Sequence, residues 1–161
     1  MTMSYEHITA EQMNGYYLEV CRGMSQSMCD PHVIVALSRG GLDMGVKLSH
    51  WFGNSELLPV QWQTRDGVAQ EKHLLKECLS KYSGMLASVL IVDDICDSGQ
   101  TLKSIDEAIS DMNLDIDVSY AVALHNADCD FEPTWWGRTI YRNVDTQWFV
   151  FPWEEWWRAN P

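Results

Sequence analysis

Basic residues are scarce in this sequence. Its 161 residues include 11 Lys and Arg against 23 Asp and Glu, a formal net charge of −12. A protein that binds along a nucleic acid needs clustered Lys and Arg to neutralise phosphates, so this composition argues against such a partner. An acidic protein that binds an anionic ligand must do so locally, through backbone N–H groups, a few basic side chains or a metal ion.

Long apolar stretches are also missing. No run approaches the roughly 20 residues that a membrane helix needs. The segment Met1–Glu6 lacks the basic start and apolar stretch of a signal peptide. We therefore expect a cytoplasmic protein without a membrane partner.

Cysteine pairs are missing too. None of the five cysteines forms a CxxC pair, and no histidine lies at metal-ligand spacing to them, so we expect no zinc site. An odd number of widely spaced cysteines is typical of reduced, mostly buried thiols. They are Cys21, Cys29, Cys78, Cys96 and Cys129.

Strand-like and helix-like patterns alternate along the chain. A capping box over Thr9–Gln12, with Ile8 and Met13 as a hydrophobic staple, predicts a helix to about Met28. Short apolar runs predict buried strands, and amphipathic segments predict helices between them. This alternation indicates one α/β domain over residues 1–161, with a mostly parallel central sheet flanked by helices and a ligand crevice beyond the strand ends. The predicted strands are 33–37, 57–63, 88–92, 118–124 and 139–144, and the further predicted helices are 42–52, 71–81 and 100–112.

The most informative segment runs from Val89 to Thr101. An apolar strand leads into paired carboxylates and then into a small-residue loop that opens a helix. Free N–H groups and the positive end of the helix dipole make such a loop a phosphate cradle, and nearby carboxylates suit sugar hydroxyls or magnesium. Solvated acids followed by an ordinary N-cap turn are the alternative. The residues concerned are Asp93, Asp94, Asp97, Ser98, Gly99, Gln100 and Thr101.

This segment closely resembles the signature of the type I phosphoribosyltransferases, which use 5-phosphoribosyl 1-diphosphate (PRPP). Residues 38–42, Ser-Arg-Gly-Gly-Leu, resemble the pyrophosphate loop of the xanthine-guanine and hypoxanthine purine enzymes, and residues 148–154 resemble their base-binding end. The resemblance covers residues 33–154. It implies a type I phosphoribosyltransferase-like fold, with a mobile lid over about 64–84 and a small C-terminal base-binding region over about 125–154.

The resemblance also implies roles for residues. Asp93 and Asp94 would bind the ribose hydroxyls directly or through Mg²⁺, the implied cofactor, and so are its candidate ligands. Asp97, the candidate catalytic residue, would also share a proton with N7 of a purine. The 5-phosphate would lie against Asp97, Ser98, Gly99, Gln100 and Thr101, and the pyrophosphate against Ser38, Arg39, Gly40 and Gly41, in a loop that carries a cis peptide in family members.

The base is less clearly defined. Trp148 would stack on it, and the Phe149 backbone would read its edge. His125 stands where the 6-oxopurine enzymes carry a lysine that contacts the exocyclic oxygen, and histidine lacks that fixed charge near pH 7. Core or interface packing is the alternative for these C-terminal aromatic residues.

The sequence therefore predicts an enzyme of purine salvage that transfers the phosphoribosyl group of PRPP to a nucleobase, with guanine, xanthine or hypoxanthine favoured. A PRPP- or nucleotide-sensing regulatory protein of the same fold is the main alternative. A receiver-type signalling domain fits less well, because its paired acids follow the first strand. The aromatic C-terminus predicts a homo-oligomer, a dimer or tetramer.

Overall fold

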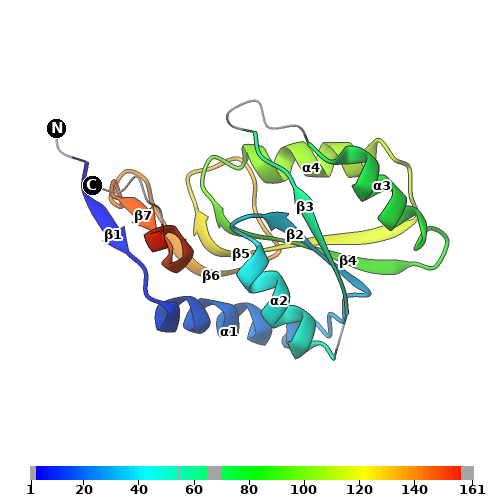
Figure 1. The fold of residues 1–161 in the computed structure, drawn as a ribbon, viewed down its shortest axis with the longest axis horizontal. Coiled ribbons are helices and arrows are strands. Elements are labelled where there is room, and N and C mark those ends of the chain that lie inside the picture. The colour runs from blue at the N-terminus through cyan, green and yellow to red at the C-terminus, as the bar shows by residue number, and fades with distance from the viewer. Residues whose placement is uncertain (1–2, 54, 65–69, 157–161) are drawn as a thin grey trace.

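A computed structural model describes residues 3–53, 55–64 and 70–156. Its centre is a parallel five-stranded sheet in the order β3-β2-β4-β5-β6 (Figure 1). The strands are β2 (Val33–Ser38), β3 (Glu56–Gln61), β4 (Ala87–Cys96), β5 (Ile116–Asn126) and β6 (Trp135–Ile140). The predicted α/β fold with a mostly parallel sheet is confirmed.

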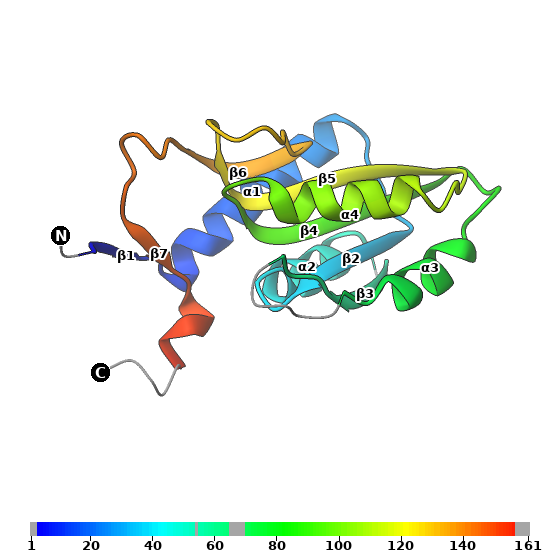
Figure 2. The same ribbon diagram turned by 90° about the horizontal axis from the view of Figure 1, so that it is seen from above.

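Helices cover both faces of this sheet (Figure 2). One core lies between the sheet and helices α1 (Ala10–Gln26) and α2 (Leu42–Trp51). A second core lies on the opposite face, beneath α3 (Lys72–Ser80) and α4 (Gln100–Ser110). Because both faces are buried, the central strands are continuous apolar runs, as in β2, where Val33 to Leu37 are at most 1% exposed.

Local signals place most of the elements. Thr9 caps α1 in a full capping box with Gln12, and Ile8 and Met13 are both buried in the first core. The prediction of a strand over 139–144 is wrong after Ile140, where β6 ends, and it misses the start of that strand at Trp135. The chain turns after β6, where Val144 N–H donates to the Tyr141 carbonyl and Tyr141 N–H donates to Asp145.

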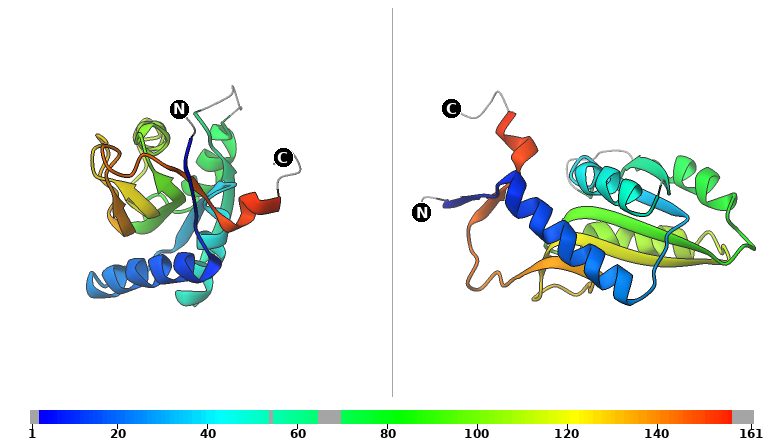
Figure 3. Two further views of the ribbon diagram at one scale, coloured as in Figure 1. Left: turned by 90° about the vertical axis from the view of Figure 1, so that its left-hand side faces the viewer. Right: turned by 90° about the horizontal axis from the view of Figure 1, so that it is seen from below.

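A second, two-stranded parallel sheet was not predicted. It pairs β1 (Tyr5–His7) with β7 (Trp148–Val150) and lies to one side of the main sheet, next to a 3-10 helix over Pro152–Trp156 (Figure 3). Strands of three residues are too short to show a period of two. This pairing brings the C-terminal aromatic segment to the end of the sheet where β4 meets α4.

None of the helices within the described ranges is both long enough and apolar enough to cross a membrane.

Candidate functional site

A cleft of about 1080 Å³ opens where the parallel strands end. It lies between the ends of β2 and β4. The chain leaves these two neighbouring strands toward opposite faces of the sheet, and open α/β sheets bind ligands at such a point. Strand β4 pairs with β2 only as far as Val92, but with β5 as far as Cys96. Within the described part of the chain, the last residues of β4 therefore pair with no strand on the β2 side, and the cleft occupies that side. Its lining includes residues 38–40, 62–64, 93–102, 142, 148, 149, 151, 153, 154 and 156.

The predicted 5-phosphate loop is part of this lining. Gly99 caps α4 in the left-handed conformation, with φ of 79°, and an added Cβ would lie 2.8 Å from Cβ of Phe131. Only glycine fits both requirements. The Gln100 N–H donates to Ser98 Oγ at 3.3 Å, and the Asn126 side chain donates to the Asp97 carbonyl at 2.9 Å. The loop is thus held in shape at the N-terminus of a helix.

The paired carboxylates lie deeper in the same cleft. Burial and the adjacent Asp94 raise the pKa of Asp93, and burial raises the pKa of Asp94 to about 6. The Asp94 N–H donates to Asp93 Oδ1 at 2.9 Å. Two carboxylates whose charge is disfavoured by burial suit a hard divalent cation, because the cation balances that charge and prefers oxygen ligands. These residues fit a magnesium ion.

The predicted pyrophosphate loop faces the carboxylate pair. The Ser38–Arg39 peptide is cis, as the resemblance implied. A Cβ added at Gly40 would lie 2.1 Å from Asp94 Oδ2, so the carboxylate is packed directly against that glycine. Gly41 does not line the cleft. A Cβ there would lie 2.3 Å from the Val92 carbonyl oxygen, so this glycine instead allows the loop to pack on β4.

Arg142 is a cleft residue that the sequence did not reveal. Its guanidinium donates to both oxygens of Asp97, from Nε to Oδ1 at 2.8 Å and from Nη2 to Oδ2 at 2.6 Å. Nη1 donates to the carbonyls of Asp145 and Gln147 at 3.0 and 2.8 Å. The hydrogen bond to Asp97 raises the pKa of Arg142, so this side chain stays charged. It connects the phosphate loop to the segment that leads into β7.

No sequence pattern marks Arg142. It lies 45 residues from Asp97 in the chain, on a turn for which the sequence pattern predicts a strand. Its role depends on the path between β6 and β7, which local residue types do not specify. The only hint in the sequence is an arginine among the few basic residues of an acidic chain.

The residues predicted to bind a base are separated by the fold. Trp148 lines the cleft with 42% of its surface exposed. Phe149 is buried beside it, with the Arg142 guanidinium 5.0 Å from its ring centroid. His125 does not line the cleft. It is 6% exposed, its Nε2 lies 3.2 Å from the Phe131 carbonyl oxygen, and its ring packs against Trp136, so its placement does not support a base contact.

The predicted lid is described only in part, since residues 65–69 lie outside the described residues. Helix α3, which ends this segment, packs Leu75, Cys78 and Leu79 into the second core. Thr64 and Thr101 place their hydroxyl oxygens 3.4 Å apart, so the start of the segment touches the phosphate loop.

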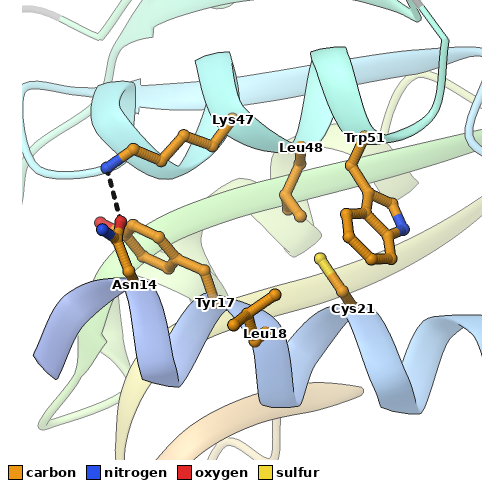
Figure 4. Close-up of a pocket in the computed structure, with 7 residues that line it drawn as sticks. All are labelled: Asn14, Tyr17, Leu18, Cys21, Lys47, Leu48 and Trp51. Carbon is orange, nitrogen blue, oxygen red and sulfur yellow. Dashed lines mark hydrogen bonds between the residues drawn. The ribbon is translucent and has the colours of Figure 1, made fainter. Parts of the chain in front are cut away.

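A smaller pocket of about 200 Å³ lies on the outer surface between α1 and α2 (Figure 4). Leu18, Leu48 and Trp51 give it an apolar lining, and Lys47 donates across its edge to Asn14 at 3.0 Å. None of the predicted site residues lines it. It therefore offers control positions for tests of the cleft.

Comparisons with known proteins agree with this geometry. Residues 17–157 match the family model described as phosphoribosyl transferase domain. No curated protein sequence matches the chain. Solved structures also share the fold, and the three described next are too distant in sequence to show more than that.

A purine phosphoribosyltransferase from Pyrococcus horikoshii is 22% identical, with a TM-score of 0.74 over 99% of both chains. A Helicobacter pylori xanthine-guanine-hypoxanthine phosphoribosyltransferase is 19% identical, with a TM-score of 0.71 over 93% of both chains. A hypothetical protein from Neisseria gonorrhoeae with bound ppGpp is 16% identical, with a TM-score of 0.68 over 96% of this chain and 91% of that one.

Proposed function

The chain belongs to the phosphoribosyl transferase domain family, and from that membership we propose that it transfers the 5-phosphoribosyl group of PRPP to a purine base and releases pyrophosphate. The observation that carries the proposal is the packing of Asp94 against Gly40, with the 5-phosphate loop on the same strand end. One cleft thus has separate walls for the two charged ends of PRPP, with carboxylates between them for the ribose.

The reaction breaks the bond between C1 of the ribose and pyrophosphate, while a ring nitrogen of the base bonds to C1. Backbone N–H groups at the start of α4 hold the 5-phosphate, aided by the hydroxyls of Ser98 and Thr101. Arg39 and the loop after β2 stabilise the negative charge that grows on the leaving pyrophosphate. Asp93 and Asp94 orient the ribose, and a magnesium ion held by them would supply further charge stabilisation on the pyrophosphate.

Asp97 accepts the proton or hydrogen bond of the base N–H group in this scheme. Arg142 is a positioning residue, because it holds both oxygens of that carboxylate and also holds the chain that enters β7. The base stacks on Trp148, a flat and partly exposed ring at the mouth of the cleft.

Replacing Trp148 with Leu should raise the KM for the base by about tenfold to a hundredfold, because a stacked base gains about 1–3 kcal/mol from an aromatic face. The KM for PRPP should change little. Steady-state kinetics with the base varied at saturating PRPP measures this. Trp51→Leu is the matched control, since Trp51 is 53% exposed on α2, away from the cleft. Equal KM values for the base in both variants would rule out stacking on Trp148.

Replacing Gly40 with Ala should lower turnover by about 10²-fold, the cost of displacing a reacting group by about 1 Å. The new Cβ would lie 2.1 Å from Asp94 Oδ2, so the carboxylate must move. Gly15→Ala is the control. A Cβ at Gly15 meets nothing within 4 Å, so turnover should be unchanged, and the unfolding free energy should rise by about 0.5–1 kcal/mol. A wild-type turnover number in Gly40→Ala would contradict the proposal that the substrate binds where Gly40 packs against the Asp94 carboxylate.

A panel of nucleobases tests the choice of substrate. Guanine, xanthine, hypoxanthine, adenine and uracil are each supplied with PRPP and Mg²⁺, and pyrophosphate release is followed. We expect release with one or more of the three 6-oxopurines. Release with uracil alone would contradict the proposed purine substrate, and release with adenine alone would contradict the 6-oxopurine preference, while either result leaves phosphoribosyl transfer intact.

A nucleotide-sensing protein is the second candidate. It is favoured by the similarity to the Neisseria gonorrhoeae protein with bound ppGpp, and by the engagement of Asp97 with Arg142, which competes with a base for that carboxylate. Calorimetric titration with ppGpp and with PRPP separates the two functions. Tight binding of ppGpp together with no pyrophosphate release from any base would favour the sensor.

A further inference from the structure

Three side chains with soft or borderline ligand atoms meet behind the phosphate loop. Cys96 ends β4, His125 lies near the end of β5, and Cys129 follows in the next turn. One ligand atom from each lies within 4.8 Å of the other two. The expectation that no histidine lies at metal-ligand spacing to a cysteine is wrong, because His125 and Cys129 are four residues apart, and their Nε2 and Sγ atoms are separated by 3.9 Å.

The distance between the two sulfur atoms matches that around a tetrahedral metal, and the 3.9 Å between Cys129 Sγ and His125 Nε2 is a few tenths of an ångström longer than zinc would hold them. The sulfur atoms of Cys96 and Cys129 lie 3.7 Å apart. Zinc with Zn–S bonds of about 2.3 Å holds two sulfur ligands about 3.8 Å apart, and a sulfur and an imidazole nitrogen about 3.5 Å apart. A disulfide needs about 2.05 Å, and all five cysteines are free. The cluster is therefore closer to a metal site than to a disulfide.

The backbone of Phe131 provides a fourth vertex. Its carbonyl oxygen lies 3.7 Å from Cys96 Sγ, 3.2 Å from Cys129 Sγ and 3.2 Å from His125 Nε2. Each thiol also has another partner within the cluster, since the two sulfur atoms contact each other and Cys129 Sγ contacts His125 Nε2. The Phe131 carbonyl oxygen is thus close to all three side chains, as a fourth ligand must be.

The hydrogen bonding of His125 is incomplete. Among the side chains that the structure describes, its Nδ1 is the one buried nitrogen or oxygen without a hydrogen-bond partner. Cys96 is 2% exposed and His125 is 6% exposed, so the cluster is largely shielded from solvent. Binding of a metal at Nε2 would leave the ring proton on Nδ1 without an acceptor, so the burial and proximity of the three side chains, and not this atom, support a metal site.

We propose that Cys96, His125 and Cys129 bind one Zn²⁺ ion, with the Phe131 carbonyl oxygen or a water molecule as the fourth ligand. Two thiolates and an imidazole are the ligands that zinc prefers, and tetrahedral geometry is its usual one. The ion would join the end of β4 to the turn after β5. Cys96 directly precedes Asp97, so the zinc site would fix the start of the phosphate loop from behind.

Binding should release thiol protons and strengthen as the pH rises. Zinc binds the thiolate and not the thiol, so each cysteine ligand must lose its proton to bind. This proposal is independent of the proposed function, because a structural zinc site does not depend on which reaction the cleft performs.

Cobalt binding tests the site on the whole protein, reduced and freed of metal with a chelator. Co²⁺ in a site with two thiolates gives an intense near-ultraviolet charge-transfer band and visible bands typical of tetrahedral coordination. We expect both in the wild type at one Co²⁺ per chain, with displacement of Co²⁺ by Zn²⁺. Cys129→Ser and His125→Gln should each weaken Zn²⁺ binding at least tenfold in a chelator competition.

Cys29→Ser is the matched control. Its thiol is partly exposed, as is that of Cys129, but it lies near Ser88 at the opposite end of the sheet. The control should keep the cobalt bands. Their absence from the reduced wild type, or their survival in both Cys129→Ser and His125→Gln, overturns the proposal. Circular dichroism of the variants checks that each is folded, and Zn²⁺ should raise the Tm of the wild type and the control but not that of Cys129→Ser.

Discussion

Replacing Asp97 with Asn should lower the turnover number by about 10²–10⁴-fold, the usual contribution of a positioned acid or base. Asparagine keeps the size of the side chain, so the loop that starts α4 should keep its shape. The backbone carbonyl of Asp97 still accepts from Asn126. The KM for PRPP should therefore change little, and calorimetry should give similar PRPP affinities for wild type and variant.

Two further variants sharpen this test. Asp111→Asn changes an exposed aspartate that follows α4, and it should leave turnover unchanged. Arg142→Met should lower turnover in the wild-type background but cost little more when added to Asp97→Asn, because residues that act through one another are not additive. Full activity in Asp97→Asn would exclude the proton-accepting role. Additive losses would mean that Arg142 acts without Asp97, either on the substrate or through the chain that enters β7.

Replacing Asp94 with Asn should have opposite effects on activity and on stability. We expect turnover to fall by about 10²–10³-fold, since a group that orients ribose and supports the cation on pyrophosphate is lost. At pH 8 without Mg²⁺, the unfolding free energy should instead rise by about 1–2 kcal/mol. Burial of an ionised carboxylate lowers the unfolding free energy, and the neutral amide of asparagine avoids this loss.

The pH dependence gives the sign of this effect. Burial raises the pKa of Asp94 from its ordinary 3.8 to about 6, so between these values the folded protein binds the proton more strongly than the unfolded chain does. The stability that this group contributes is complete below about pH 4 and is lost as the pH rises through 6. Urea unfolding of wild type and variant at pH 4, 6 and 8 should show a gap that widens with pH. A constant gap would contradict the burial of this carboxylate.

Local sequence was enough to predict the fold and that the paired acids and the glycine loop lie together at the end of β4. The capping box at Thr9, the apolar strands and the glycine at the start of α4 each specify a local conformation that tertiary packing does not override. The paired acids and the phosphate loop follow one strand, so their proximity is fixed by the chain itself. The family and the fold are confirmed, whereas the roles of single site residues stay predictions.

The remaining features depend on contacts between distant parts of the chain. Arg142 reaches Asp97 only because the turn after β6 crosses the strand ends. His125 occupies the position expected for a base contact, but Cys129 and Phe131 fold back over it, so it lies behind the loop instead of in the cleft. Periodicity and residue type do not reveal such contacts between segments that are distant in the sequence.

Phosphoribosyl transfer itself can be measured most directly by following both products. Purified protein is incubated with PRPP, Mg²⁺ and the best 6-oxopurine of the panel, and nucleoside monophosphate and pyrophosphate are quantified together. We predict equal amounts of the two products, formed many times per enzyme molecule by the wild type and nearly lost in Asp97→Asn. Tight PRPP binding without any nucleoside monophosphate, whichever base is supplied, would contradict the proposed reaction.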